Sequence, residues 1–312
     1  MKAVVTGGAG FIGSALVRHL LSEGVGHVVA FDNLNSGHRH NLEGLGERVH
    51  LIEGDIRDYD AVAQAFAGAD YVFHLAAIPS VPRSIKEPIP SHDVNINGSF
   101  NVFRAAQACG VKRVVYAASS SAYGDTEVLP KVETMQANPK SPYAAQKLMG
   151  EYYASVFSSC FGLETVSLRF FNVFGPRQDP GSAYSGVLSL FMKSLITGES
   201  PTIFGDGEQS RDFTYVEDVA GLVWKAARAE GVSGMVFNAG NGNRYTLNQT
   251  WEMLQEIAGR KLPAKYGPPR EGDVKHSQAD TTAARAALGH DPQFTFEEGL
   301  RRTFDWYRQS LA

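Results

Sequence analysis

Two side chains that could exchange a proton lie four residues apart in the segment Ser141-Pro-Tyr-Ala-Ala-Gln-Lys147. If this segment is helical, Tyr143 and Lys147 project from one face, because positions i and i+4 are neighbours on a helix. Ser141 suits the N-cap of such a helix, and Pro142 suits its first position, where the missing N–H costs nothing. An ammonium close to a phenol favours the phenolate, so Lys147 is expected to lower the pKa of Tyr143 from about 10 toward that of a general base. The same spacing also occurs by chance on surface helices, so its meaning depends on the rest of the chain.

A glycine-rich turn lies near the N-terminus, in Thr6-Gly-Gly-Ala-Gly-Phe-Ile-Gly13. It follows an apolar, β-branched run and precedes an amphipathic helical pattern. Gly7 and Gly10 let the backbone turn tightly and approach a pyrophosphate at the start of that helix, and Gly13 lets helix and strand pack closely. The spacing is one residue longer than the Gly-x-Gly-x-x-Gly fingerprint, and a glycine turn alone could be only a tight turn. Its place between a strand and a helix predicts a dinucleotide-binding site.

Residues at the ends of the following strands indicate which dinucleotide binds. Asp32 ends the second predicted strand, where a carboxylate accepts hydrogen bonds from the adenosine ribose and repels a 2′-phosphate, so NAD is expected rather than NADP. Asp55, after the third strand, either reaches the adenine or caps a turn. Leu75-Ala-Ala77 ends the fourth strand with small residues, which let its backbone lie along the cofactor phosphates. Asn95 either bridges neighbouring strands through its amide or contacts a ligand.

Strand and helix patterns alternate through the first half of the chain. This alternation predicts an α/β fold of the Rossmann type, a doubly wound parallel sheet with helices on both faces. The predicted strands lie at 3–5, 28–31, 49–52, 71–75, 114–117 and 165–170, and helical patterns lie at 11–21, 61–66 and 99–108. Ligands bind outside the carboxyl ends of such strands. The serine turn Ala117-Ala-Ser-Ser-Ser-Ala-Tyr-Gly124, after the fifth strand, is therefore expected to face the nicotinamide and a substrate.

The pattern changes after Asn172 to glycine- and proline-rich loops, followed by shorter helices and strands. We therefore predict an NAD-binding Rossmann domain over residues 1–172, with returning segments near 213–229 and 235–239. A smaller C-terminal α/β substrate lobe is predicted over residues 173–312.

Composition and charge argue against several other functions. The formal net charge of −4 gives no electrostatic case for nucleic acid or an anionic membrane surface. No apolar run approaches the roughly 18 residues of a membrane helix, and the first strand begins at Lys2, leaving no room for a signal peptide. Cys109 and Cys160 lie inside apolar helical patterns, so we expect no disulfide framework and a cytoplasmic location. His38-Arg-His40 has no cysteine or carboxylate at ligand spacing, so we expect no metal.

Together, the motifs resemble those of the extended short-chain dehydrogenases/reductases, and within them the NAD-dependent nucleotide-sugar 4-epimerases. The resemblance covers essentially the whole chain and rests on Gly7-x-x-Gly10-x-x-Gly13, Asp32, the serine turn, Tyr143-x-x-x-Lys147, Arg169-Phe-Phe-Asn172, Arg211-Asp-Phe and Arg270-x-Gly-Asp273. It implies that Tyr143 is the acid and base at the sugar 4-hydroxyl, that Lys147 holds the nicotinamide ribose, and that Ser119 hydrogen-bonds the 4-oxygen. It also implies a homodimer formed through helices at 90–109 and 142–161.

The second half is expected to bind a UDP-sugar. A guanidinium presents a fixed fork to phosphate oxygens, so Arg211 and Arg270 are expected to hold the diphosphate. By the resemblance, Asp273 accepts from the uridine ribose and Asn172 contacts the diphosphate or the sugar. Phe204 either lines the uracil or packs in the core.

One position bears on the choice of sugar. Ser277 matches the place that faces the sugar 2-substituent, where a tyrosine excludes an N-acetyl group and a small residue admits it. Ser80-Val-Pro-Arg83-Ser and Gln178 also resemble the branch that acts on UDP-N-acetylhexosamines. The resemblance thus favours UDP-N-acetylglucosamine and UDP-N-acetylgalactosamine, with UDP-glucose and UDP-galactose as further substrates.

The expected cofactor contacts are Gly7, Gly10, Phe11, Ile12, Gly13, Asp32, Asn33, Asn35, Ser36, Gly37, Asp55, Ile56, Leu75, Ala76, Ala77, Asn95, Tyr143, Lys147, Phe170 and Val173. The expected substrate contacts are Ser80, Arg83, Ser119, Ser121, Tyr143, Asn172, Gln178, Val187, Phe204, Arg211, Arg270, Asp273 and Ser277.

Other reactions of related enzymes leave signals that can be compared with this chain. The 4,6-dehydratases and decarboxylases place carboxylates after the catalytic Thr or Ser, whereas this chain has Ser120 and Ser121, which are poor replacements for proton transfer. A UDP-glucuronate 4-epimerase, or another NAD-dependent enzyme that modifies nucleotide sugars, remains an alternative because Arg83 could meet a 6-carboxylate. A non-catalytic NAD-sensing protein is a remote alternative, since it predicts a damaged catalytic pair.

Overall fold

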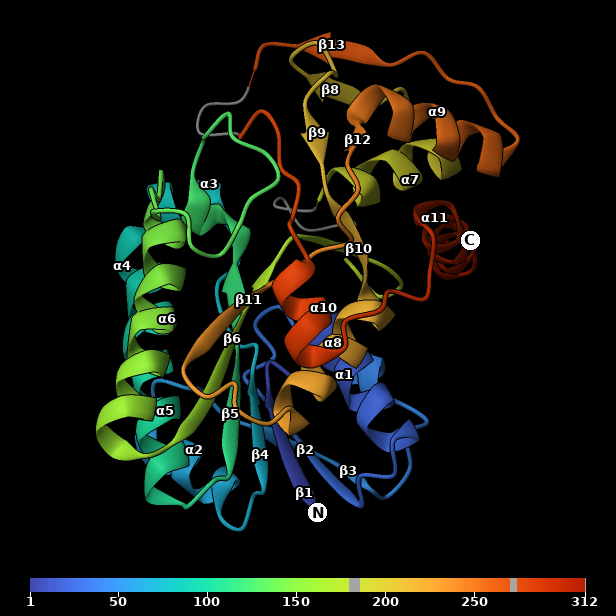
Figure 1. Ribbon diagram of the computed structural model, residues 1–312. Helices are drawn as coiled ribbons and strands as arrows, with labels where there is room; N and C mark the ends of the chain where they lie inside the picture. Colours follow the sequence, from blue (N-terminus) through green and yellow to red (C-terminus); the bar gives the residue numbers. More distant parts are fainter. Residues whose placement is uncertain (180–185, 270–273, 312) are drawn as a thin grey trace.

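A seven-stranded parallel sheet forms the centre of the molecule, in the strand order β11-β6-β5-β4-β1-β2-β3 (Figure 1). The computed structural model describes residues 1–179, 186–269 and 274–311. The strands are β1 Lys2–Thr6, β2 His27–Asp32, β3 Val49–Glu53, β4 Tyr71–His74, β5 Arg113–Ser119, β6 Glu164–Phe170 and β11 Met235–Ala239. β2 and β3 lie on one side of β1, and β4, β5 and β6 lie on its other side, so the strand order switches between β1 and β4. Such a switch point leaves a crevice at the carboxyl edge of the sheet. The predicted fold class is confirmed.

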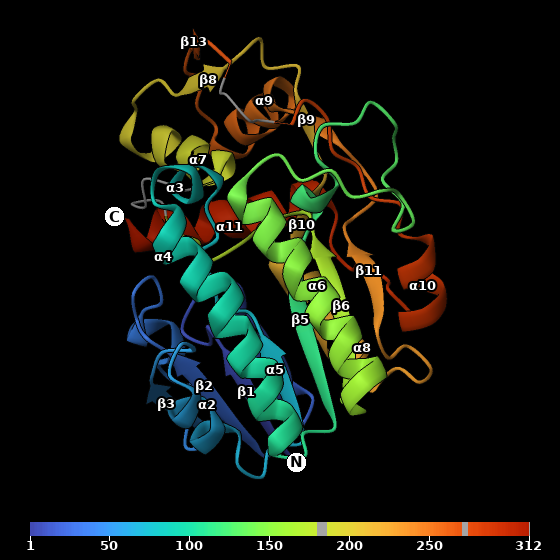
Figure 2. The same cartoon turned by 90° about the vertical axis from the view of Figure 1, so that its left-hand side faces the viewer.

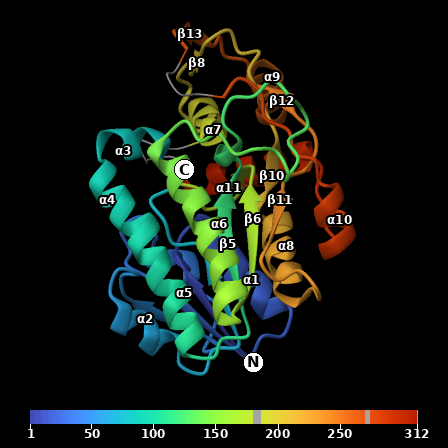
Figure 3. The same ribbon diagram turned by 60° about the vertical axis from the view of Figure 1, so that its left-hand side comes forward.

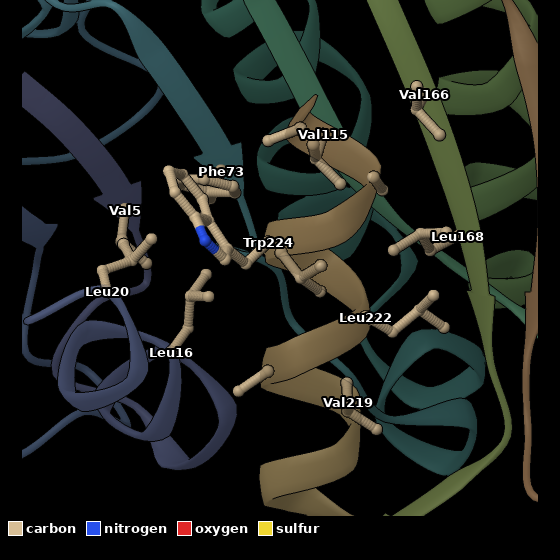
Figure 4. Close-up of a cluster of buried hydrophobic side chains, with 14 of the residues drawn as sticks. Val5, Leu16, Leu20, Phe73, Val115, Val166, Leu168, Val219, Leu222 and Trp224 are labelled. Carbon is tan, nitrogen blue, oxygen red and sulfur yellow. The ribbon is translucent and has the colours of Figure 1, made fainter. Parts of the chain in front are cut away.

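Helices cover both faces of this sheet, which explains why β5 is buried along its whole length. Against one face pack α1 Phe11–Ser22 and α8 Val216–Arg228, and α10 Thr282–Leu288 lies beside α8. Against the other face pack α2 Tyr59–Phe66, α5 Ser99–Ala108 and α6 Pro142–Phe161, with α6 running alongside β5 and β6 (Figure 3). In the hydrophobic core between the sheet and the helices α1 and α8, Trp224 of α8 approaches Phe73 of β4 and Leu16 of α1 (Figure 4).

The smaller lobe has a separate hydrophobic core, which includes Phe191, Trp251, Phe296 and Tyr307. Its helices are α7 Val187–Thr197, α9 Leu247–Ala258 and α11 Phe296–Ser310. Three two-stranded sheets accompany them: β7 Asn172–Phe174 with β10 Phe213–Tyr215, β9 Ser210–Arg211 with β12 Tyr245–Thr246, and β8 Thr202–Phe204 with β13 Lys265–Gly267. The division at residue 172 stays a prediction. α8 contributes side chains to the core of the large sheet, and β11 is an edge strand of that sheet.

Short helices connect the sheet layers. They are α3 Val81–Lys86 and α4 Pro88–His92, the π-helical segment η2 Asp93–Gly98 that runs into α5, and the 3-10 helices η1 Arg39–Leu42 and η3 Ser120–Tyr123. None of the helices in the described part of the chain has the length and apolar composition needed to cross a membrane.

Candidate active site

A cavity of about 1130 Å³ opens at the carboxyl edge of the large sheet. Its lining includes the glycine turn after β1, the ends of β2, β4, β5 and β6, and the N-terminal turns of α6. Arg211 and Ser277 line it from the smaller lobe. The cavity therefore lies where the fold places a ligand site, between the two halves of the chain.

The glycine turn is shaped to hold a group that needs close backbone approach. Gly7 has φ of 70°, and a Cβ on it would lie 2.9 Å from the nitrogen of Ala76. A Cβ on Gly13 would lie 2.0 Å from the carbonyl oxygen of Gly7. Helix α1 has Gly10 as its N-cap, so it has no side-chain cap, and its first turn contains no acidic residue. This uncapped helix start, with the glycine turn that leads into it, fits the pyrophosphate of the expected cofactor.

A buried chain of hydrogen bonds fixes the backbone behind this turn. The amide of Ala76 donates to Thr6 Oγ1 at 3.3 Å, and Thr6 Oγ1 lies 2.8 Å from His74 Nδ1. His74 Nε2 lies 2.9 Å from Ser99 Oγ, which donates to the carbonyl of Asn95 at 2.7 Å. Because the Ser99 proton is used there, His74 Nε2–H must donate to Ser99 and His74 Nδ1 must accept from Thr6. Burial and the charge of Lys147 lower the pKa of His74 to about 3, so this ring is neutral.

Two carboxylates line the part of the cavity expected to hold adenosine. Asp32, at the end of β2, is buried and accepts from the amides of Ala9 at 3.0 Å and Leu34 at 2.8 Å. Asp55 accepts from the Arg57 guanidinium, and these hydrogen bonds lower the pKa of Asp55 to about 2. Asp55 therefore lines the cavity and also holds its own turn, so its two expected roles do not exclude each other.

Ser119, Tyr143 and Lys147 line the same cavity, as the motifs predict. The side chains of Ser119 and Tyr143 share a hydrogen bond, and Lys147 Nζ donates to the carbonyl of Ala117 at 2.8 Å. The start of α6 is fixed by Ser141, which caps it, and by Ser84, whose hydroxyl accepts from the amide of Tyr143 at 3.1 Å. A hydroxyl, a phenol and an ammonium are thus brought together at the end of β5.

The protonation of this group differs in one respect from the sequence-based expectation. Burial raises the pKa of Tyr143, and the hydrogen bond from Ser119 only partly opposes that effect. Burial lowers the pKa of Lys147 to about 8, and the charge of Glu151 opposes this shift. The expected lowering of the Tyr143 pKa by Lys147 is therefore wrong for the protein alone, because burial of the phenol dominates and the ammonium donates to a backbone carbonyl.

Several expected substrate contacts meet at the other end of the cavity. Asn172 donates to the carbonyl of Asp212 at 3.1 Å and to Ser277 Oγ at 3.4 Å, which holds Ser277 at the lining. Arg83 lines the cavity but is paired with Glu87 at 3.1 Å. The other expected contacts that line it are Ser121, Gln178 and Arg211 for the substrate, and Phe11, Ile12, Asn33, Asn35, Ser36, Ile56, Leu75, Ala76, Ala77, Phe170 and Val173 for the cofactor.

Among the described residues, five expected contacts do not line the cavity, and three of these five belong to the Rossmann half. Asn95 is buried, and its amide bonds Ile78 and Gln146, so it joins a loop to α6 rather than bridging strands. Ser80 is also buried and caps α3. At Gly37, the space a side chain would need is occupied by the Asp32 carboxylate, 2.8 Å from an added Cβ.

The other two belong to the smaller lobe. Val187 begins α7 and packs against the core of that lobe, and Phe204 ends β8. Arg270 and Asp273 lie outside the described residues.

Two functional features were not found from the sequence. Asp212 is buried and accepts from the amides of Asn241, Gly242 and Ala279, and burial raises its pKa to about 6. It joins segments far apart in the chain next to Arg211 and Ser277. The second is the bonding of His74, whose partners lie 68 and 25 residues away, so no local pattern could have indicated it.

The sequence and the fold are both similar to those of known proteins. Residues 3–240 match the NAD dependent epimerase/dehydratase family. The chain is 37% identical over 312 residues to a UDP-glucose 4-epimerase of Mycolicibacterium smegmatis, covering 99% of each protein. It resembles the structure of a UDP-N-acetylglucosamine 4-epimerase from Methanobrevibacter ruminantium in complex with UDP-N-acetylmuramic acid, with a TM-score of 0.94, 40% identity, and coverage of 99% and 98% of the two chains. It also resembles a Thermus thermophilus UDP-glucose 4-epimerase in complex with NAD, with a TM-score of 0.90, 36% identity, and coverage of 99% of each chain.

Proposed function

Since this chain belongs to the NAD dependent epimerase/dehydratase family and is a UDP-sugar 4-epimerase, we propose that it interconverts UDP-N-acetylglucosamine and UDP-N-acetylgalactosamine. The family and the NAD cofactor predicted from the motifs are confirmed. The observation that carries the proposal is the meeting of Ser119, Tyr143 and Lys147 at one cavity with Asn172 and Ser277.

In the proposed mechanism, Tyr143 as phenolate takes the proton of the sugar 4-hydroxyl. Ser119 donates a hydrogen bond to the same oxygen, and Lys147 holds the nicotinamide ribose. When bound, NAD would supply hydride-transfer chemistry at C4 in both directions, and its positive charge would favour the phenolate. Arg211 keeps the UDP group in place while the 4-keto sugar turns within the cavity. Tyr143 then returns the proton to the 4-oxygen of the inverted sugar, so the net reaction consumes no redox equivalents.

The residues after Ser119 favour epimerisation over elimination. Ser120 and Ser121 line the cavity at the place where a dehydratase or decarboxylase needs a carboxylate. A hydroxyl cannot exchange protons there at a useful rate near neutral pH. The 4-keto sugar is therefore expected to be reduced again rather than to lose water or carbon dioxide.

The choice of sugar is tested by assaying single substrates. The purified protein is incubated separately with UDP-N-acetylglucosamine, UDP-N-acetylgalactosamine, UDP-glucose, UDP-galactose and UDP-glucuronate, and the C4 epimers are resolved. The proposal predicts turnover of the N-acetylated sugar with the highest kcat/KM. A tenfold or greater preference for UDP-galactose over UDP-N-acetylgalactosamine rejects it. The pairing of Arg83 with Glu87 speaks against the uronate alternative, because the guanidinium charge is already matched.

Substituting Ser277→Tyr is expected to remove activity on N-acetylated sugars selectively. The hydroxyl of Ser277 accepts from Asn172, so a larger side chain must extend into the cavity. Forcing added atoms against a packed wall costs about 1–3 kcal/mol, which predicts a roughly five- to 150-fold lower kcat/KM for UDP-N-acetylgalactosamine. Activity on UDP-galactose should be retained, and Ser277→Ala serves as the control that keeps both. Equal losses on the two sugars in Ser277→Tyr would contradict the assigned position.

We also propose that the protein is a homodimer through α5 and α6, which pack side by side on one outer face of the molecule (Figure 2). That face exposes large apolar side chains: Tyr152 is 57% exposed, Val156 45%, Met149 42% and Phe100 39%. Helix α6 thus carries apolar residues both toward the sheet and away from it. A second copy of the same two helices would remove this surface from water.

A charge placed on this face should yield monomers. Because burying an unpaired carboxylate is costly, Tyr152→Glu is expected to shift the protein from dimer to monomer in light scattering after gel filtration. Tyr266→Glu is the matched control, since Tyr266 is 59% exposed and lies on β13 of the smaller lobe. A monomeric wild-type protein, or a Tyr152→Glu variant that stays dimeric, would contradict the proposal.

A further inference from the structure

An ion pair is buried directly behind the catalytic residues. Glu151, one helical turn beyond Lys147 on α6, accepts from Arg169 of β6 through both carboxylate oxygens, at 2.9 and 2.8 Å. The side chains of Arg169 and Glu151 are only 6% and 3% exposed. The bidentate geometry fixes the carboxylate relative to the sheet. We call Glu151 and Arg169 the charge pair.

The charge pair also reaches the turn that carries Ser119. The Arg169 guanidinium lies 4.6 Å from the centre of the Tyr123 ring, at the end of η3. Tyr123 in turn donates to Asn238 of β11 at 2.6 Å. The elements that bear Lys147 and Ser119 are thus joined by one buried network.

The surroundings of Lys147 contain little else that could stabilise an ammonium. Its Nζ donates to a neutral carbonyl and lies 5.0 Å from the ring centre of Tyr116, whose pKa burial raises well above its ordinary value. His74 is neutral, and burial raises the pKa of Tyr143. Among the described groups, Glu151 is the one whose charge opposes the effect of burial on Lys147.

We propose that Glu151 is a positioning residue that keeps Lys147 charged at working pH, and that Arg169 sets the strength of this effect by binding the same carboxylate. This inference rests on the proposed function, because the proposed mechanism requires the ammonium of Lys147 at the active site. It adds that this ammonium depends on a carboxylate that does not line the cavity.

Removing either partner changes the charge around Lys147 in opposite directions. Without the Glu151 carboxylate, Lys147 and Arg169 remain as two buried cations, and Lys147 gives up its proton because a guanidinium does not. Without the Arg169 guanidinium, Glu151 has Lys147 as its remaining nearby cation, so the ammonium is favoured. A pair with only a structural role has no reason to act in two directions.

The pH dependence of kcat tests this difference. Activity needs charged Lys147, so it falls as the pH rises through the Lys147 pKa, and a lower pKa moves this basic limb to lower pH. Glu151→Gln is expected to move the limb down by about one pH unit or more, and Arg169→Leu is expected to move it up. Glu164→Gln is the matched control, because Glu164 is paired with Arg113 at the amino end of the sheet. A basic limb that stays at the wild-type pH in both variants, or moves the same way in both, overturns the inference.

A double variant keeps the inference testable where a single unpaired charge prevents folding. Glu151→Leu with Arg169→Met replaces the buried pair by apolar side chains, which is often tolerated. In this double variant the Lys147 pKa should be lower than in the wild type. The pKa is measured by side-chain nitrogen NMR, and the Lys147 signal is identified by its absence from the spectrum of Lys147→Met. An unchanged Lys147 pKa overturns the proposed effect of the charge pair on Lys147. Absence of any UDP-sugar turnover by the wild-type protein instead overturns the proposed function, and the NMR titration still tests the pair.

Discussion

Tyr143→Phe is expected to lower kcat by about 10²- to 10⁴-fold, the contribution typical of a positioned acid and base. The phenol lines the cavity beside Ser119, and no other described side chain that hydrogen-bonds Ser119 titrates as an acid and base, since Ser121 offers only a hydroxyl. The loss should appear in single-turnover rates of epimerisation, with UDP-sugar affinity changed little. Burial raises the pKa of Tyr143, so the residue depends on nearby positive charge to act as a base.

The control for this variant is Tyr153→Phe, the same chemical change on the same helix. Tyr153 packs against Phe100 of α5 and does not line the cavity. Its variant should turn over at the wild-type rate. Near-normal turnover by Tyr143→Phe, with NAD still bound, would remove Tyr143 from the mechanism.

Gly13→Ala is expected to yield a protein that no longer holds NAD and is less stable. The new Cβ would lie 2.0 Å from the carbonyl oxygen and 2.8 Å from the carbonyl carbon of Gly7, and these backbone atoms cannot move without opening the turn. Such overpacking costs at least about 1–3 kcal/mol in the free energy of unfolding. The measurements are the NAD released on denaturation per protein chain and the thermal unfolding midpoint.

Gly26→Ala provides the matched control, because its added Cβ would meet no atom closer than 3.8 Å. That variant should keep its cofactor and its stability. Full NAD content in Gly13→Ala would contradict the assignment of the glycine turn as the pyrophosphate site.

The large sheet could be predicted because its signals are local. β1, β2 and β5 are continuous apolar runs, as strands buried on both faces must be, and the structure extends them by only one or two residues at each end. The two-stranded sheets of the smaller lobe gave no such signal. β9 and β12 contain two residues each, too few for any period to appear.

The site was predictable to the extent that its spacing is set by one element. Tyr143 and Lys147 share a helix face whatever surrounds them. The direction of the Tyr143 pKa, by contrast, depends on burial by other elements, and the expectation from the pair alone was wrong. Asn95 has a structural role, one of its two expected roles, but the partners of its amide could not be predicted for the same reason, because Ile78 and Gln146 come from distant segments. A sequence shows which groups are available, but not which of them the fold has already bonded.

The most direct test of the account follows hydrogen at C4. UDP-N-acetylglucosamine carrying deuterium at C4 is incubated with the purified protein, without added NAD, and the product is examined by mass spectrometry and NMR. If Tyr143 moves only the hydroxyl proton while the C4 hydrogen leaves and returns within the closed site, UDP-N-acetylgalactosamine will retain the deuterium at C4. Product with solvent hydrogen at C4 would contradict the account.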